Sequence, residues 1–177
     1  FARRSGGGVA ALLLAGLAIN ALCGAAIGFL TYLSDDQQLR SLSFWTMGSL
    51  GGALWTQIAV CCSVLIPALL LLTRSARQLD VLQLGDRSAE YLGIDPRQLQ
   101  RRTVILAALI VGSCVAVSGV IGFVGLLVPH LLRMLIGPQH RWLLPGSALL
   151  GALLLLAADT LARTVVAPAE LPVGVIT

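Results

Sequence analysis

The sequence predicts an all-α membrane protein, a polytopic bundle of transmembrane helices. Hydrophobic residues make up 57% of its 177 residues and charged residues only 11%, whereas soluble domains average roughly 45–50% and about 25%. About 20 apolar residues in a helix cross the hydrocarbon core of a bilayer, which is roughly 30 Å thick. The long uncharged runs lack the alternating pattern of barrel strands, so helices are left as the way to satisfy the backbone in lipid.

The uncharged runs and the arginines together predict the order and direction of the spans within a single transmembrane domain covering residues 1–177. We expect spans over about residues 8–33, 45–73, 103–121 and 142–163, a short or broken helix over 124–136, and the start of another span at 172. Short loops rich in arginine stay on the cytoplasmic side. The segment from Arg74 to Arg102 is such a loop, so the first span runs outward and the second runs inward.

The uncharged stretch from Thr103 to Leu132 decides the remaining topology. It is too long for one untilted span and too short for two full ones. Its second half contains Gly119, Gly122, Gly125 and Pro129. Such residues are tolerated where other helices or a water-filled cavity cover the freed backbone. A helix that breaks here and turns back keeps the following basic residues, Arg133 to Arg141, in the cytoplasm.

The charged segment between the second and third spans has features of a docking surface. Gly85 and Gly93 can end or turn short helices, and Asp95 followed by Pro96 is typical of a helix N-terminus. An apolar face within a charged rim, as in protein interfaces, is offered by Leu82, Leu84, Tyr91, Leu92 and Ile94. A solvated linker is the alternative interpretation.

Catalytic and metal sites are not predicted. The four cysteines fall in spans without the spacing of metal ligands and are interpreted as small buried side chains. No motif ties Ser113, His130 and Asp159 together. His130 could ligate heme iron, although it also fits a helix-start or packing role. Asp159 is expected to pair with Arg163, four residues later on the same helix.

Three blocks of sequence resemble a known family. "SGVIGFVGLLVPHLLRMLIGPQHRWLLPGSALLGALLLLAADTLARTVVAPAELPVGVIT", "FWTMGSLGGALW" and "LQLGDRSAEYLGI" are similar to the FecCD-type permease subunits of bacterial ABC importers for iron–siderophores, heme and cobalamin. "AGLAINALCGAAIG" and "SDDQQLRSLSFWTMGSLG" resemble hemin permeases most. Such permeases have ten spans, and this chain resembles the second half, from the fifth span to the start of the tenth. A start without methionine and an end in "LPVGVIT" also lead us to expect part of a longer protein.

The resemblance implies a permease subunit that carries heme or another iron chelate across the bacterial inner membrane by alternating access. It implies a homodimer, two cytoplasmic ATPase subunits that use ATP and magnesium, a periplasmic binding protein, and contact with membrane lipid. It implies no cofactor bound by this chain, no nucleic-acid partner and no enzymatic activity. Cobalamin and ferric siderophores remain alternative substrates. A passive channel and a membrane-embedded enzyme are remote alternatives.

The resemblance also implies roles for particular residues. We call residues 79–100 the coupling segment, because in this family a pair of short cytoplasmic helices docks into a cleft of the ATPase. The expected ATPase contacts are Leu84, Gly85, Asp86, Ala89, Leu92 and Gly93. Arg163 is expected to meet the binding protein. Pathway-lining positions are expected at Ala18, Asn20, Gly24, Gly119 and Gly122, although Asn20 could equally bond across helices.

Overall fold

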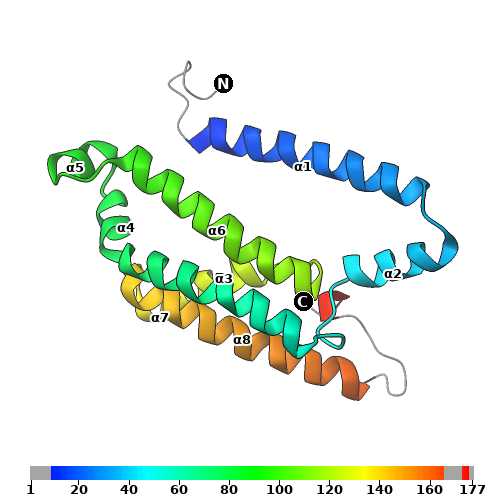
Figure 1. Cartoon of the computed structure of the whole chain (residues 1–177). Helices are drawn as coiled ribbons and strands as arrows, with labels where there is room; N and C mark the ends of the chain where they lie inside the picture. The colour runs from blue at the N-terminus through cyan, green and yellow to red at the C-terminus, as the bar shows by residue number, and fades with distance from the viewer. Residues whose placement is uncertain (1–8, 166–172, 176–177) are drawn as a thin grey trace. The chain divides into compact units, whose positions relative to one another are not determined.

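The computed structural model describes residues 9–165 and 173–175, and every regular element in these ranges is helical. The chain divides into two compact units, Phe1–Ser43 and Phe44–Thr177. The first unit contains α1 (Val9–Tyr32) and most of α2 (Asp36–Thr46) (Figure 1). The part of α1 from Leu13 to Tyr32 is long and apolar enough to cross a membrane. Its last turn is closed by the Thr31 and Ser34 hydroxyls, which donate to carbonyls one turn earlier.

The second span begins later than the sequence predicts. We expected it over about residues 45–73, but α2 ends at Thr46 and α3 covers Trp55–Arg74. Gly48 lies between them with φ +71°, in the left-handed region that interrupts a right-handed helix. The next residue, Ser49, donates its backbone N–H to the Ser118 carbonyl at 2.9 Å. The connection is therefore fixed by a distant part of the chain, and this excludes a continuous helix from residue 45.

Two long helices, α3 and α6 (Pro96–Ser118), pack against each other in opposite directions (Figure 1). Both are long and apolar enough to span a membrane. Between them, Cys61 Sγ donates to the Ser113 carbonyl at 3.5 Å. The described cysteines are all free thiols, and Cys61, Cys62 and Cys114 are partly buried, whereas Cys23 is exposed. The interpretation of the cysteines as buried side chains is thus wrong for Cys23.

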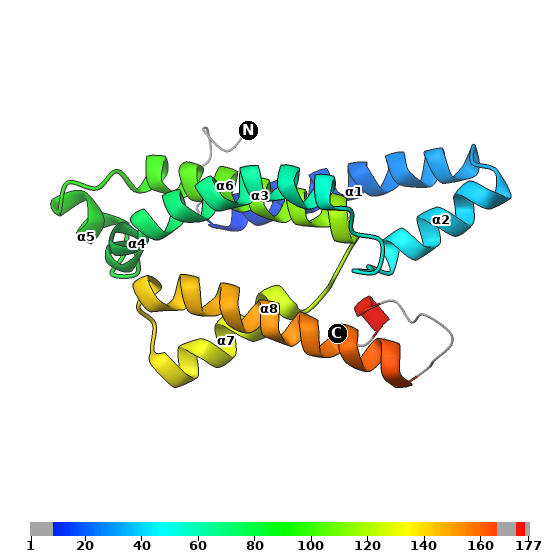
Figure 2. The same ribbon diagram turned by 60° about the horizontal axis from the view of Figure 1, so that its bottom comes forward.

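The chain turns back after α6, as the glycines predict. α6 ends at Ser118, and α7 covers Val124–Ile136. With 13 residues, α7 is about 20 Å long, which is too short to cross the hydrocarbon core. α8 (His140–Val165) then packs antiparallel to α7 (Figure 2). A Cβ added at Gly146 of α8 would lie 3.4 Å from Leu132 Cδ1 of α7, so a small residue allows this close approach.

The end of the chain is described only in part. The expected start of a further span at residue 172 lies outside the described residues. The residues that follow, Val173–Val175, form a short 3₁₀ helix, η1, which contacts α8. Val173 is almost completely buried.

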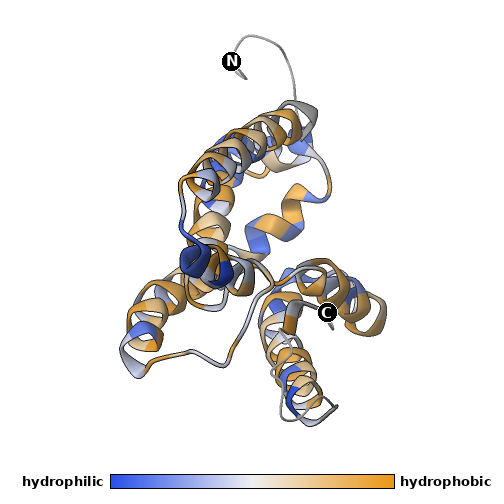
Figure 3. Cartoon of the chain, turned by 90° about the vertical axis from the view of Figure 1, so that its right-hand side faces the viewer, coloured by the Kyte–Doolittle hydropathy of each residue, from blue (hydrophilic) through white to orange (hydrophobic). Residues whose placement is uncertain are grey.

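Few large side chains are buried within the described residues. The buried hydrophobic residues are Ala68, Ala76, Ala89, Leu99, Val128, Leu143, Ala158, Ala162 and Val173. Most leucines, isoleucines and aromatic residues of the long helices are instead exposed, and apolar residues cover much of the helix surface (Figure 3). Such surfaces are suited to lipid or to further helices. With four helices of spanning length and composition, the chain is a multi-pass membrane protein.

Candidate functional site

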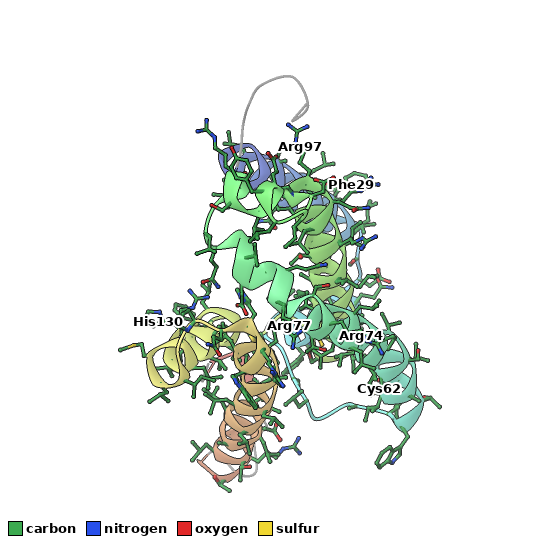
Figure 4. The ribbon with its side chains drawn as sticks, turned by 90° about the vertical axis from the view of Figure 1, so that its left-hand side faces the viewer. Phe29, Cys62, Arg74, Arg77, Arg97 and His130 are labelled. Carbon is green, nitrogen blue, oxygen red and sulfur yellow. The ribbon has the colours of Figure 1, made fainter. Side chains whose placement is uncertain are left out.

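The coupling segment is built from two short helices that follow α3 at its arginine-rich end. α4 covers Ala76–Leu82 and α5 covers Asp86–Tyr91. Arg74 and Arg77 lie at the junction of α3 and α4 (Figure 4). None of the apolar helices of spanning length includes α4 or α5. Both short helices therefore lie in the arginine-rich segment that we expect to face the cytoplasm.

Gly93 ends α5 in the way that the sequence predicts. Its φ is +78°, and its N–H donates to the Glu90 carbonyl at 3.0 Å. The next N–H, that of Ile94, donates to the Ala89 carbonyl at 2.9 Å. This pair of bonds is the Schellman motif, which uses glycine because the position after the helix is left-handed. The chain thus reverses sharply between α5 and α6.

Asp95 begins α6, also as predicted. Its carboxylate accepts the backbone N–H groups of Arg97 at 2.9 Å and Gln98 at 3.2 Å, and Pro96 occupies the first turn. These N–H groups have no partner inside the helix, so the cap satisfies them. Gly85, before α5, has φ +101° and ψ +156°, a conformation that is essentially restricted to glycine. Both ends of α5 are therefore defined by glycine turns.

The apolar residues of the coupling segment divide into an inner and an outer set. Ala89 is 0% exposed, so it packs inside the segment and does not offer its side chain to a partner. Leu84, Leu92 and Tyr91 are 69%, 63% and 90% exposed, and Asp86 is also exposed. A hollow of about 130 Å³ between α4 and the start of α6 has a lining that includes Gln78, Ile94, Gln98 and Arg102. The outer set is therefore accessible to a partner.

A contact that the sequence analysis missed joins α4 to the loop between α7 and α8. Asp80 Oδ1 lies 2.8 Å from the backbone N and 2.7 Å from the ring Nδ1 of His140. Gln83 Nε2 donates to the Pro138 carbonyl at 3.3 Å and lies 3.0 Å from His140 Nδ1. We assign the Nδ1 proton to the bond with Asp80, because a carboxylate is the stronger acceptor. No local signal reveals this contact, since Asp80 and His140 are 60 positions apart.

The charge of Asp80 is stabilised by this contact. Partial burial raises the pKa of Asp80. The hydrogen bonds that it accepts from the backbone and the ring of His140, together with the charge of that ring, lower the pKa by more. The pKa therefore lies below its usual value of 3.8. Because the folded-state pKa is lowered, the resulting stability is fully present above pH 3.8 and is lost as the pH falls through the lowered value.

Arg163 lies near the opposite end of α8 from His140. Its Nε donates to Asp159 Oδ2 at 2.8 Å, and its Nη2 donates to Asp159 Oδ1 at 3.3 Å. The predicted pairing of these two residues is confirmed. The Arg163 side chain is 50% exposed. The Asp159 carboxylate therefore orients the Arg163 guanidinium near the C-terminal end of α8.

The expected pathway residues fall in both units. Ala18, Asn20 and Gly24 are exposed on α1, in the first unit. Gly119 and Gly122 lie in the turn between α6 and α7, in the second unit. A Cβ at Gly119 would clash with the Trp45 carbonyl oxygen, whereas one at Gly122 would meet open space. The role of these positions in a pathway stays a prediction.

Side chains that could bind a metal ion are dispersed over the part of the chain that the structure describes. No group of three or more His, Cys, Asp or Glu side chains in this part is placed to hold a metal ion. His130 is exposed on α7 and points outward from it (Figure 4).

Comparison with known proteins agrees with the fold and with the sequence blocks. The chain is 63% identical over 171 residues to the hemin transport system permease protein HmuU of Yersinia pestis, covering 97% of this chain and 51% of that protein. It is 48% identical over 168 residues to the vitamin B12 import system permease protein BtuC of Vibrio cholerae, covering 95% and 50%. The chain thus spans about half the length of these relatives.

A solved structure has the same fold. It is described as an inward-facing conformation of a "putative metal-chelate type ABC transporter". The TM-score is 0.90 and the sequence identity 34%, and the match covers 96% of this chain and 55% of that one. The model of the FecCD transport family matches residues 1–177. The coupling segment, the turn after α6 and the paired arginine on α8 are therefore features of a chain that belongs to the FecCD transport family.

Proposed function

We propose that this chain is part of the permease subunit of an ATP-driven importer for heme or another iron chelate in the bacterial inner membrane. In this proposal the subunit works as a homodimer, two cytoplasmic ATPase subunits hydrolyse ATP with magnesium, and a periplasmic binding protein delivers the substrate. The chain itself carries out no catalysis and binds no cofactor. The observation that carries the proposal is the coupling segment, because a passive channel has no need of a docking surface for an ATPase.

Three properties of the coupling segment support docking. Its apolar residues Leu84, Tyr91 and Leu92 are exposed, whereas Ala89 of the same segment is fully buried. Glycine turns and the Asp95 cap hold these helices in place, so little ordering entropy is lost on binding. Charged residues around them, such as Asp86, Arg87 and Glu90, are exposed and resemble the polar rim of an interface.

Docking is tested by co-purification of the ATPase with variants of the full-length permease. Leu92→Asp removes no buried contact, because Leu92 is 63% exposed, yet it places a charge in the proposed interface. Gly93→Pro cannot adopt φ +78° and loses the N–H bond to Glu90. We expect each variant to weaken ATPase retention by about 10-fold or more, and coupled transport in liposomes to fall with it.

The controls are conservative changes at the same positions. Leu92→Met keeps an apolar side chain, and Gly93→Asn keeps a residue that tolerates the left-handed conformation. Both should retain the ATPase. If Leu92→Asp and Gly93→Pro also retain full assembly and coupled transport, the segment is a solvated loop and the proposal fails.

The binding protein is expected to meet Arg163. An exposed ion pair contributes at most about 1 kcal/mol, so we expect Arg163 to affect the rate and orientation of docking more than its final affinity. Arg163→Glu should slow association of the binding protein and lower transport, and the defect should shrink as salt is raised. Association kinetics on reconstituted transporter measure this effect, and salt-insensitive, unchanged association in the variant would contradict it.

The substrate is the least constrained part of the proposal. The 63% identity to a hemin permease favours heme over cobalamin, for which the relative is 48% identical. Uptake into proteoliposomes that contain the full importer, measured separately with heme, a ferric siderophore and cobalamin, decides between them. Preferred uptake of cobalamin or of the siderophore would replace heme and leave the importer proposal intact.

A further inference from the structure

The Asp80–His140 contact links the coupling segment to the longest helix of the chain. His140 is the first residue of α8, so its N–H is among those without a partner inside the helix. Asp80 accepts this N–H and the ring Nδ1 with one carboxylate oxygen. A negative charge at the start of a helix is also favoured by the helix dipole. α4 therefore provides the N-terminal cap of α8.

Gln83 strengthens the same link. It lies three positions after Asp80 in the chain, close to the end of α4, so both side chains project from the same side of that turn. It donates to the Pro138 carbonyl, just before α8. The side chains of Asp80 and Gln83 thus contact three atoms at the start of α8 and just before it. These atoms are the Pro138 carbonyl oxygen, the His140 backbone N and the His140 ring Nδ1. We call Asp80, Gln83 and His140 the latch.

The far end of α8 carries the other functional residue. With 26 residues, α8 is about 39 Å long, which exceeds the hydrocarbon core of a bilayer. The latch lies at its first residue, and Arg163 lies in its last turn. α8 is one continuous helix between these points, although Pro145 in its second turn removes one backbone hydrogen bond. Displacement at one end is therefore expected to reach the other. In contrast, α3 and α6 connect the coupling segment to the opposite end of this unit, where Gly48 precedes α3 and Gly119 follows α6.

We propose that the latch fixes α8 to the coupling segment, so that docking of the binding protein at the Arg163 end is transmitted through α8 to the ATPase. This inference rests on the proposed function and assigns Asp80, Gln83 and His140 as positioning residues. Because coupling free energy is reciprocal between sites, nucleotide bound to the ATPase changes the affinity of the binding protein through the same latch. No atom of the latch needs to touch substrate.

Graded variants of His140 test the transmission in the full-length importer in liposomes. His140→Ala removes the ring contacts and keeps the backbone N–H. His140→Pro removes both, and proline is accepted at the first position of a helix. Gln139→Ala is the matched control, because Gln139 is the neighbouring exposed residue and no hydrogen bond of its side chain is recorded among the described residues. The readout is the factor by which loaded binding protein stimulates ATP hydrolysis.

We expect the ATPase to co-purify with all three variants. Stimulation should fall at least about 5-fold in His140→Pro, fall less in His140→Ala, and stay unchanged in Gln139→Ala. Wild-type stimulation in His140→Pro overturns the inference. If the wild-type importer itself fails to retain the ATPase, the proposed function has failed instead, so the two failures are distinguishable.

A cross-link provides the opposite test. Asp80→Cys with His140→Cys is placed in a full-length permease that lacks other cysteines. Under reducing conditions this variant lacks the latch, and stimulation should be as low as in His140→Pro. A covalent bridge between the two cysteines should restore it. If bridging leaves stimulation low or blocks transport, the two elements must separate during the cycle, and the inference is wrong.

Discussion

The two ends of the unit Phe44–Thr177 are held together in different ways. At the coupling end, side chains make the connection: Asp80 and Gln83 reach across to the start of α8. At the other end, backbone meets backbone. A Cβ at Gly48 would lie 2.6 Å from the Val120 carbonyl oxygen, and one at Gly174 would clash with the Met47 carbonyl oxygen. We call Gly48, Gly119 and Gly174 the glycine junction.

This difference indicates which end tolerates substitution. A hydrogen bond made by a side chain can be replaced by one to water when that side chain is changed, so the net cost is modest. Backbone segments in direct contact leave no room for a neighbour to shift by even a methyl group. The glycine junction is therefore expected to be rigid and intolerant of substitution. The coupling end is expected to tolerate substitution at a moderate cost in stability.

The largest expected effect is at Gly119. Gly119→Ala adds a Cβ that clashes with the Trp45 carbonyl and approaches Gly48 Cα to 3.1 Å, at a φ of +72°. Steric overlap with backbone and an unfavourable conformation act together, so we expect loss of folded, monodisperse permease in detergent. Gly122→Ala is the control in the same turn, because its Cβ would meet open space. Comparable yield and melting temperature for the two variants would remove the distinction between the ends.

Gly85 isolates the conformational part of that effect. Gly85→Ala is strained, because φ is +101° and ψ is +156°, but its Cβ would meet no neighbour within 4 Å. We expect a loss of about 1–3 kcal/mol with the fold retained, measured as a lower melting temperature of purified permease. Retention of the ATPase should weaken in parallel. A collapse as complete as that of Gly119→Ala would mean that strain alone explains both.

Asp95 gives the smallest of these effects. Asp95→Ala leaves the N–H groups of Arg97 and Gln98 without their cap, which typically costs about 1 kcal/mol. Asp95→Asn keeps an oxygen acceptor and should restore most of that stability. Hydrogen exchange of the first turn of α6 measures the loss locally. Equal exchange in the alanine variant and the wild type would show that the cap contributes little at this end.

The sequence alone predicted those turns and helix ends whose geometry depends on neighbouring residues. The turn at Gly93 and the cap at Asp95 follow from residues within one helical turn, and both were predicted. The break after α6 followed from its glycines and from the positive charges beyond it. The start of α3 was predicted wrongly, because Gly48 is fixed by packing against the turn after α6. That contact joins segments far apart in the chain, where periodicity carries no information.

The coupling segment shows the same limit. Its helices were predicted, but the inward position of Ala89 depends on how α4, α5 and α6 pack. The latch was missed because nothing in "RQLDVLQLG" or "GPQHRW" indicates the partner of Asp80. Exposed polar residues near helix ends are ordinarily solvated, so a pairing between α4 and the start of α8 is visible only in the tertiary structure.

The predominance of alanine among the buried residues reverses the usual direction of mutational sensitivity. In soluble proteins the costly core changes remove atoms and leave cavities, as when leucine becomes alanine. Here Ala68, Ala158 and Ala162 are buried, and little can be removed from them. Addition of a single methyl or methylene group instead separates helices whose contact depends on small side chains. Natural variation should therefore be narrow at these alanines.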